Sequence, residues 1–212
     1  MGVQVVVLPK QWPWGQPEPG DTALHPVILI LNWVAMGNFT LMRHGMADFP
    51  LGRERKLIGG CMDWVPLTPV GVAQVEARLP QLIANQFTQI ISSPMTRALQ
   101  SAALLSRGLN LPLQVEFDLH EWLPDLTFRF DSFAPVQQAI NERQALGNEW
   151  PPGVVCNWEP FSRIRQRVKR VLSRYDACGP VLVVCHQTVI EALTGVELAC
   201  AETIAYQSPA VA

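Results

Sequence analysis

Short apolar runs alternate along the chain with longer segments whose apolar residues recur at helical spacing. The first run ends at Met42, directly before Arg43, and the others lie at residues 89–91, 113–115 and 181–185. Runs of this length suit strands, and the uninterrupted run at 181–185 is typical of a central parallel strand covered on both faces. One more short strand is expected within residues 202–212. This alternation predicts an α/β fold with a mainly parallel sheet.

Helix signals follow the first run. Thr68 is placed to cap a helix, and Pro69 suits the first helical position. Apolar residues then recur at helical spacing as far as residue 83, and Pro80 is expected to kink or shorten this element.

A second helix is expected after the Ser-Ser-Pro sequence at 92–94, with Arg97 in its first turn and Gly108 as its stop. The segment 161–175 carries apolar residues on one helical face and six basic residues mostly on the others, which predicts an amphipathic helix with a solvated basic face. A last helix is expected from residue 187 to a stop at Gly195.

Chemically competent side chains stand where the predicted strands end. They are Arg43, His44, Arg97, Glu121 and His186. In an open α/β sheet, ligands bind beyond the carboxyl ends of the strands, so these positions form a candidate site. Gly45 permits the backbone turn that releases the first two side chains from the strand.

Each of these residues also has a purely structural interpretation. Arg43 and His44 could form a charged strand end, and Glu121 could be a solvated loop residue. Arg97 could be a surface arginine on an amphipathic helix. We favour a functional role for Arg97, because an arginine in the first turn opposes the helix dipole and therefore usually has another reason to be there.

Residues 1–35 lack a regular pattern, because prolines and glycines interrupt it. We interpret them as an irregular N-terminal extension to a domain at 36–212; alternatively, Met36 is the natural start. The apolar run within 26–33 is shorter than the roughly 20 residues that span a bilayer. Extending the window to 22–42 brings in polar side chains, so we expect no membrane association.

Residues 122–160 interrupt the α/β rhythm. Five prolines and three tryptophans fall in this stretch, which carries no recognisable motif. We predict an insertion that lies over the site and selects the substrate.

Composition, net charge and cysteine content indicate which binding partners and which cellular compartment to expect. The 212 residues are 49% hydrophobic and 16% charged, with a net charge of -2, which suits a globular domain and gives no reason to expect nucleic acid as a partner. The five cysteines are odd in number and widely spaced, so we expect a cytoplasmic protein without a disulfide framework. The oligomeric state is left open.

The ordered set of motifs resembles the histidine phosphatase superfamily, the phosphoglycerate mutase-like enzymes, over residues 38–205. The matching segments are Leu-Met-Arg-His-Gly at 41–45, Asp-Trp-Val-Pro-Leu-Thr-Pro-Val-Gly at 63–71, Ser-Ser-Pro-Met-Thr-Arg-Ala-Leu-Gln-Ser-Ala at 92–102, Leu-His-Glu at 119–121 and Val-Val-Cys-His at 183–186. Each motif is short, and their combination in this order is specific.

The resemblance implies a three-layer α/β/α fold and phosphoryl transfer to a histidine and then to water, with no cofactor and no metal. By matching position, His44 is the nucleophile, and Glu121 protonates the leaving oxygen and then activates water. Arg43, Arg97 and His186 bind the phosphate oxygens. Two arginines and a second histidine can supply charge compensation without a metal, because phosphoryl transfer depends mainly on positioning and electrostatics.

Two departures from the family pattern narrow the expected activity. Residues 46–50 differ from the residues that usually follow Arg-His-Gly in the mutases, which argues against mutase activity. Gln187 stands where a glycine commonly follows the second histidine, and it could crowd the phosphate or donate to it. We therefore expect a phosphatase for a small phosphorylated metabolite. The alternatives are a protein phosphatase for phosphohistidine or phosphoserine, and a non-catalytic phosphate-binding protein.

Overall fold

The computed structural model describes residues 38–208. The predicted N-terminal extension at 1–35 lies outside the described residues, as does most of the apolar window at 22–42. Among the described residues, no helix is long and apolar enough to cross a membrane.

One sheet of five strands organises this domain, in the order β3-β2-β4-β1-β5. The strands are β1 (Asn38–Arg43), β2 (Gln89–Ser92), β3 (Leu113–Val115), β4 (Val181–Cys185) and β5 (Thr203–Gln207). The first four are parallel, and β5 pairs antiparallel to β1 at the edge. Arg43 lies opposite Cys185 in the register of β1 and β4, so both strands end at the same level.

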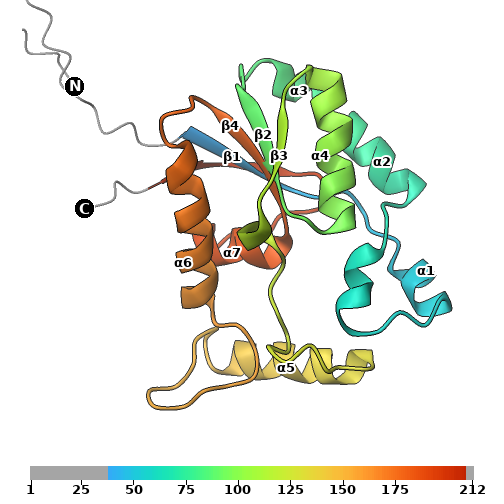
Figure 1. Ribbon diagram of the computed structural model, residues 1–212, viewed down its shortest axis with the longest axis vertical. Coiled ribbons are helices and arrows are strands. Elements are labelled where there is room, and N and C mark those ends of the chain that lie inside the picture. The colour runs from blue at the N-terminus through green and yellow to red at the C-terminus, as the bar shows by residue number, and fades with distance from the viewer. Residues whose placement is uncertain (1–37, 209–212) are drawn as a thin grey trace, which may run out of the picture. The chain divides into compact units, whose positions relative to one another are not determined.

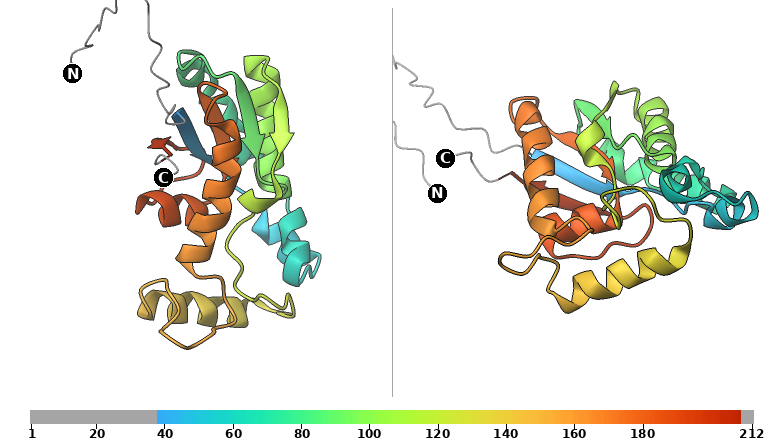
Figure 2. Two further views of the ribbon diagram at one scale, coloured as in Figure 1. Left: turned by 60° about the vertical axis from the view of Figure 1, so that its left-hand side comes forward. Right: turned by 60° about the horizontal axis from the view of Figure 1, so that its bottom comes forward.

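Helices cover both faces of the sheet, as Figures 1 and 2 show. On one face lie α2 (Pro69–Glu76), α3 (Leu79–Ile83) and α4 (Thr96–Leu109). On the other lie α6 (Phe161–Leu172) and α7 (Gln187–Thr194). This arrangement confirms the expected three-layer α/β/α fold around a mainly parallel sheet.

Alternating side chains of the central strands fill two separate cores. Leu41 and Val183 pack into the core beneath α6 and α7, whereas Met42 and Val184 pack into the core beneath α2, α3 and α4. All five residues of β4 are buried. A strand with apolar layers on both sides reads as a continuous apolar run, which explains the pattern at 181–185.

The helix boundaries largely follow the predicted signals. The Oγ1 atom of Thr68 accepts a hydrogen bond from the amide of Gly71 (2.9 Å) and caps α2. The element that contains Pro80 is divided into α2 and α3, as expected. Gly195 adopts a left-handed conformation (φ 71°) and ends α7.

The predicted stop of α4 at Gly108 is wrong. The helix continues to Leu109 and ends at Asn110, whose left-handed conformation has φ 53°. Asparagine tolerates this conformation better than most residues. Gly108 instead permits close packing, because a Cβ atom there would lie 2.6 Å from the side chain of Leu79.

Residues 122–160 leave the sheet and return to it. This excursion contains α5 (Phe133–Ala145), which lies on the side where the parallel strands end (Figures 1 and 2). Its two ends are joined by backbone hydrogen bonds from the amide of Glu159 to the oxygen of Leu123 (2.9 Å) and from the amide of Leu126 to the oxygen of Asn157 (2.7 Å). Its interpretation as an insertion stays a prediction.

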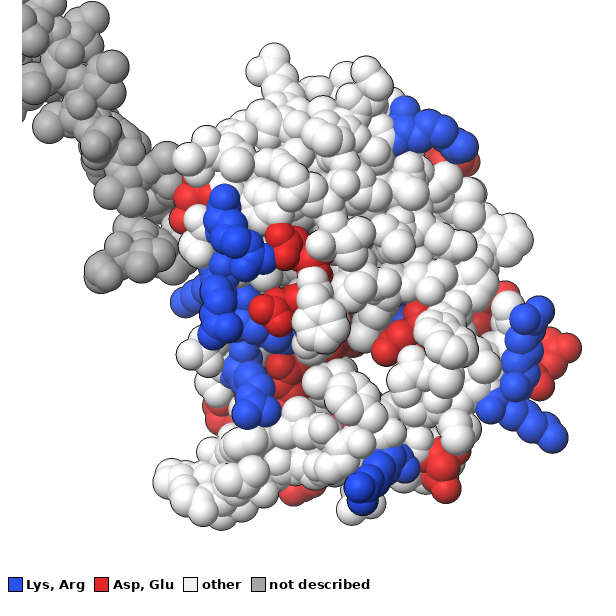
Figure 3. All heavy atoms as spheres, viewed as in Figure 1, with Lys and Arg blue, Asp and Glu red and all other residues white. Residues whose placement is uncertain are grey.

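The basic residues of 161–175 gather along α6, where Figure 3 shows a column of Lys and Arg side chains. Arg163, Lys169, Arg170 and Arg174 are exposed, in agreement with the predicted solvated face. Arg167 departs from that prediction, because it is buried.

Candidate active site

His44 follows the last residue of β1 and is 5% exposed. Its backbone amide donates to the oxygen of Cys185 (3.1 Å), which ties it to the end of β4. Its Nδ1 atom lies 2.7 Å from the oxygen of Gly45. Because a carbonyl oxygen can only accept, Nδ1 carries the proton, and the lone pair of the imidazole is on Nε2.

The imidazole of His44 is neutral over the physiological range. Burial lowers its pKa from 6.5 to about 3, and the positive charges of Arg97 and Arg43 act in the same direction, against the hydrogen bond to Gly45. Since a protonated imidazole has no lone pair on Nε2, this environment maintains a nucleophilic nitrogen in mildly acidic solution.

Two glycines bring the loop after β1 against the start of α2. A Cβ atom at Gly45 would lie 2.4 Å from the oxygen of Gly71, and one at Gly71 would lie 2.2 Å from the oxygen of Met46. The amide of Gly45 donates to Oγ of Ser101 on α4 (3.1 Å). The loop that carries His44 is therefore fixed by backbone contact with the helix layer.

Arg97 lies in the first turn of α4, as predicted, and is 5% exposed. Its Nε donates to Nε2 of His44 (3.3 Å). Its Nη1 contacts Oδ1 of Asp63 (3.4 Å), and its Nη2 contacts the sulfur of Met95 (3.2 Å). The guanidinium thus stands directly at Nε2 of His44, the nitrogen that carries the lone pair.

His186 directly follows β4 and is fully buried. Its ring centroid lies 5.2 Å from that of His44, at an interplanar angle of 65°. Its Nε2 is 2.7 Å from Oγ of Ser93, and its Nδ1 has no partner among the described residues. Burial and the charge of Arg97 hold its pKa well below 6.5.

Glu121 is partly buried beside the same cluster. Its amide contacts the sulfur of Met95 (3.4 Å), the atom that also contacts Arg97. Its Oε1 accepts from the amide of Trp122 (2.7 Å). Burial raises the pKa of its carboxyl group, against the lowering effect of this hydrogen bond and of the Arg97 charge. A raised pKa suits a group that must carry a proton.

Arg43 and Gln187 both bind the backbone of Leu198. Nη1 of Arg43 donates to its oxygen (2.6 Å), and Oε1 of Gln187 accepts from its amide (2.9 Å). Gln187 is therefore occupied by the loop before β5. The structure brings His44, Arg97 and His186 into contact and places Glu121 beside them, whereas the described hydrogen bond of Arg43 is to this loop.

Several polar contacts of the site were not assigned from the sequence. Asp63 pairs with Arg97, Ser93 holds His186, and Oγ of Ser101 accepts from Gly45 and donates to the oxygen of Arg97 (2.8 Å). All three lie within the motifs that carry the family resemblance, which was the available signal. Burial raises the pKa of Asp63, against the effect of Arg97.

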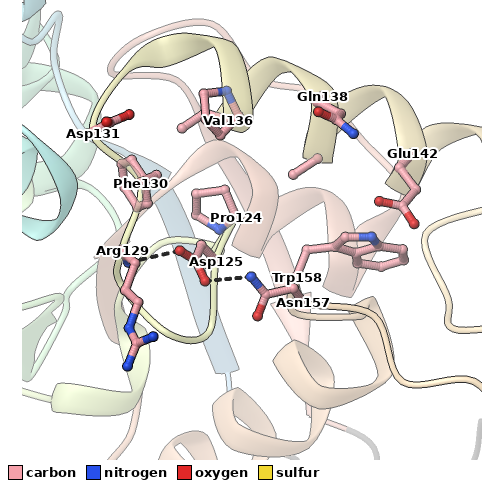
Figure 4. Close-up of a pocket in the computed structure, with 12 residues that line it drawn as sticks. Pro124, Asp125, Arg129, Phe130, Asp131, Val136, Gln138, Glu142, Asn157 and Trp158 are labelled. Carbon is pink, nitrogen blue, oxygen red and sulfur yellow. Dashed lines mark hydrogen bonds between the residues drawn. The ribbon is translucent and has the colours of Figure 1, made fainter.

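A separate cavity of about 340 Å³ lies under α5 (Figure 4). Asp125 organises its wall by accepting from the amide of Arg129 (2.8 Å) and from Nδ2 of Asn157 (2.6 Å). None of the predicted site residues lines this cavity. The strand-end cluster is the candidate site, because the imidazole of His44 and the guanidinium of Arg97 meet there. Within residues 38–208, no three His, Cys, Asp or Glu side chains are placed to hold a metal ion.

Comparison with known proteins identifies relatives of this chain. The adenosylcobalamin/alpha-ribazole phosphatase of Salmonella typhimurium is 30% identical over 132 residues, which cover 60% of this chain and 65% of that protein. The Escherichia coli protein of the same name is also 30% identical over 132 residues, covering 60% and 64%. The match thus spans slightly less than two thirds of these relatives.

Solved structures share the fold. A mycobacterial glucosyl-3-phosphoglycerate phosphatase superposes with a TM-score of 0.62 at 20% identity, covering 80% of this chain and 89% of that one. A protein of Thermus thermophilus superposes with a TM-score of 0.56 at 22% identity, covering 79% and 92%. Residues 39–203 match the family description of branch 1 of the histidine phosphatases. The chain therefore belongs to the histidine phosphatase superfamily, as its motifs predicted.

Proposed function

We propose that this protein hydrolyses phosphomonoesters through a phosphohistidine formed on His44. The observation that carries the proposal is the position of the nucleophilic nitrogen. Nε2 of His44 holds a lone pair, and the guanidinium of Arg97 is 3.3 Å from it. A neutral nucleophile beside fixed cationic and hydrogen-bonding groups is what in-line phosphoryl transfer requires.

In the first step, Nε2 of His44 attacks phosphorus as the bond to the ester oxygen breaks. Glu121, whose carboxyl pKa is raised by burial, is proposed to give a proton to the departing oxygen. In the second step, the Glu121 carboxylate takes a proton from a water molecule that attacks the phosphohistidine. Inorganic phosphate leaves, and His44 returns to its neutral form.

Arg97, Arg43 and His186 are proposed to bind the phosphate oxygens. Arg97 contacts Asp63 and Met95, and a bound phosphate would replace these contacts. Nε of Arg43 and Nδ1 of His186 are buried and have no hydrogen-bond partner among the described residues. These donors are available to an anionic ligand, although Arg43 must turn toward it.

The substrate that we propose is a small phosphorylated metabolite. The names of the relatives support this class, since they include alpha-ribazole and glucosyl-3-phosphoglycerate phosphatases. The position of α5 on the side where the strands end fits a site that admits a small ester. Phosphoserine and phosphohistidine peptides test the protein-phosphatase alternative.

The decisive assay measures p-nitrophenyl phosphate hydrolysis by purified protein with a chelator present. We expect metal-independent turnover, and a loss of at least about 10³-fold in His44→Ala, because the nucleophile is removed. Rapid acid-free quenching with a labelled substrate should trap an acid-labile phosphoenzyme that is absent in the variant. Activity that survives the substitution, or that requires added metal, contradicts the mechanism. A panel that includes alpha-ribazole phosphate then ranks substrates.

A further inference from the structure

Arg167 stands apart from the other basic residues of α6. It is 7% exposed, while most of its basic neighbours reach solvent. Its Nε and Nη2 atoms donate to the two carboxylate oxygens of Glu159 (2.8 and 3.0 Å), and Glu159 is 1% exposed. Such a forked pair fixes the plane of the guanidinium.

The remaining donors of Arg167 reach the segment that carries the proposed general acid. Nη1 donates to the oxygen of Asp118 (2.5 Å), and Nη2 makes a longer contact with the oxygen of Glu121 itself (3.5 Å). Nδ1 of His120 also donates to the oxygen of Glu121 (2.7 Å). The main chain at Asp118 and at Glu121 is thereby tied to Arg167 of α6.

Glu159 also anchors Trp122, the residue that follows Glu121 in the chain. Its backbone oxygen accepts from the indole Nε1 of Trp122 (2.7 Å). The buried pair of Arg167 and Glu159 therefore contacts the backbone of Glu121 and, on either side of it, Asp118 and Trp122. Buried ion pairs often contribute little net stability compared with apolar packing, so a role in defining geometry accounts better for their presence.

The sheet alone does not hold Glu121 in place. β3 is an edge strand of three residues and ends at Val115, six positions before the acid. The long excursion begins immediately after it. A general acid must lie within hydrogen-bond reach of the leaving oxygen, and a displacement of about 1 Å can cost on the order of 10²-fold in rate.

We propose that Arg167 is a positioning residue for Glu121 and that Glu159 holds Arg167 in this role. The inference rests on the proposed function of Glu121 as the general acid. Arg167 touches no reacting atom; it sets the backbone from which the carboxyl group extends.

The test compares two substrates that depend differently on the acid. p-Nitrophenolate leaves readily without a proton, whereas the alkoxide of glycerol 2-phosphate requires one. In Arg167→Met, kcat/KM should fall at least tenfold more for glycerol 2-phosphate than for p-nitrophenyl phosphate. A residue that only stabilised the fold would lower both values by the same factor, and equal losses overturn the inference.

A double-substitution cycle separates positioning from an independent effect. Glu121→Gln should show the same leaving-group signature, and adding Arg167→Met to it should lower glycerol 2-phosphate turnover by less than about threefold further. If the loss of activity in the double variant equals the product of the losses in the two single variants, the proposal is contradicted. If Arg167→Met fails to fold, Glu159→Gln, which weakens the hold on Arg167, is measured in the same way and must give the same ratio.

Arg165→Met serves as the matched control. Arg165 lies on the same helix and pairs with Glu149, and its Nη1 contacts the oxygen of Ala192 (3.4 Å). It makes no described hydrogen bond to the segment around Glu121. Its loss should leave the ratio of the two activities unchanged. Absence of His44-dependent hydrolysis in the unaltered protein would refute the proposed function; an unchanged ratio in Arg167→Met alongside that hydrolysis refutes only this inference.

Discussion

The lowered pKa of His44 should make the folded protein sensitive to mild acid. The unfolded chain binds a proton at this histidine near pH 6.5, whereas the folded chain resists protonation down to about pH 3. Below pH 6.5 the unfolded state therefore holds more protons, and the free energy of unfolding decreases as the pH falls. The contribution of His44 to this loss should extend through the window between these two pKa values.

The expected size follows from the two pKa values. Between pH 7 and pH 5, protonation of an ordinary histidine in the unfolded chain lowers the free energy of that state by about 2 kcal/mol, while the buried His44 gains no proton. His44→Asn removes the titrating group. The variant should therefore lose about 2 kcal/mol less stability than the unaltered protein over the same interval, whatever its stability at pH 7.

Urea unfolding followed by tryptophan fluorescence, in phosphate-free buffers at pH 7 and pH 5, measures this difference. Other titrating groups, such as Asp63 and His186, are present in both proteins, so their contributions largely cancel. Unchanged denaturant slopes would establish that the two proteins unfold over the same surface. Equal losses of stability would show that His44 takes up its proton in the folded state and would refute the argument for a neutral nucleophile in acid.

Three further substitutions test other parts of the site. Arg97→Lys should lower kcat/KM on an aryl phosphate by about 10²- to 10³-fold, because an ammonium cannot reproduce the forked guanidinium contacts; a loss below tenfold would contradict this role. Gly71→Ala should destabilise the protein by more than about 2 kcal/mol in thermal unfolding, since its Cβ would lie 2.2 Å from a backbone oxygen, whereas Gly60→Ala meets nothing within 4 Å and should change stability little. Ser93→Ala removes the partner of His186 and should cost about 1–2 kcal/mol of stability and lower turnover, both measured on the same sample.

The sequence was sufficient to predict the strand ends, because buried parallel strands leave continuous apolar runs and polar residues stand out where the runs stop. It did not reveal the spatial order of the strands. β4, the fourth strand in sequence, lies between β2 and β1 and brings His186 to His44. Chain order carries no local signal for this arrangement, because it is set by which helices cover which face.

Arg167 shows a second limit of pattern reading. It lies three residues after Ile164 and four before Val171, both fully buried, so helical spacing places it on the apolar stripe. Because basic residues surround it in the sequence, Arg167 was assigned with them to the solvated face. Similarly, glycine preference favoured Gly108 as the end of α4, while packing against Leu79 accounts for that glycine and Asn110 ends the helix.

The hydrogen bonds that join the two ends of the excursion have a consequence for protein engineering. The amide of Glu159 meets the oxygen of Leu123, and the amide of Leu126 meets the oxygen of Asn157, so the excursion is closed at its base independently of its length. Because closing a longer loop adds little entropy cost, an exchanged segment can differ in length while that base is retained, provided that it also supplies the core packing of Ala139 and the contact of Asn148 with the start of α6. The domain can therefore accept exchanged segments as cassettes, each tested for a new substrate on an unaltered catalytic frame.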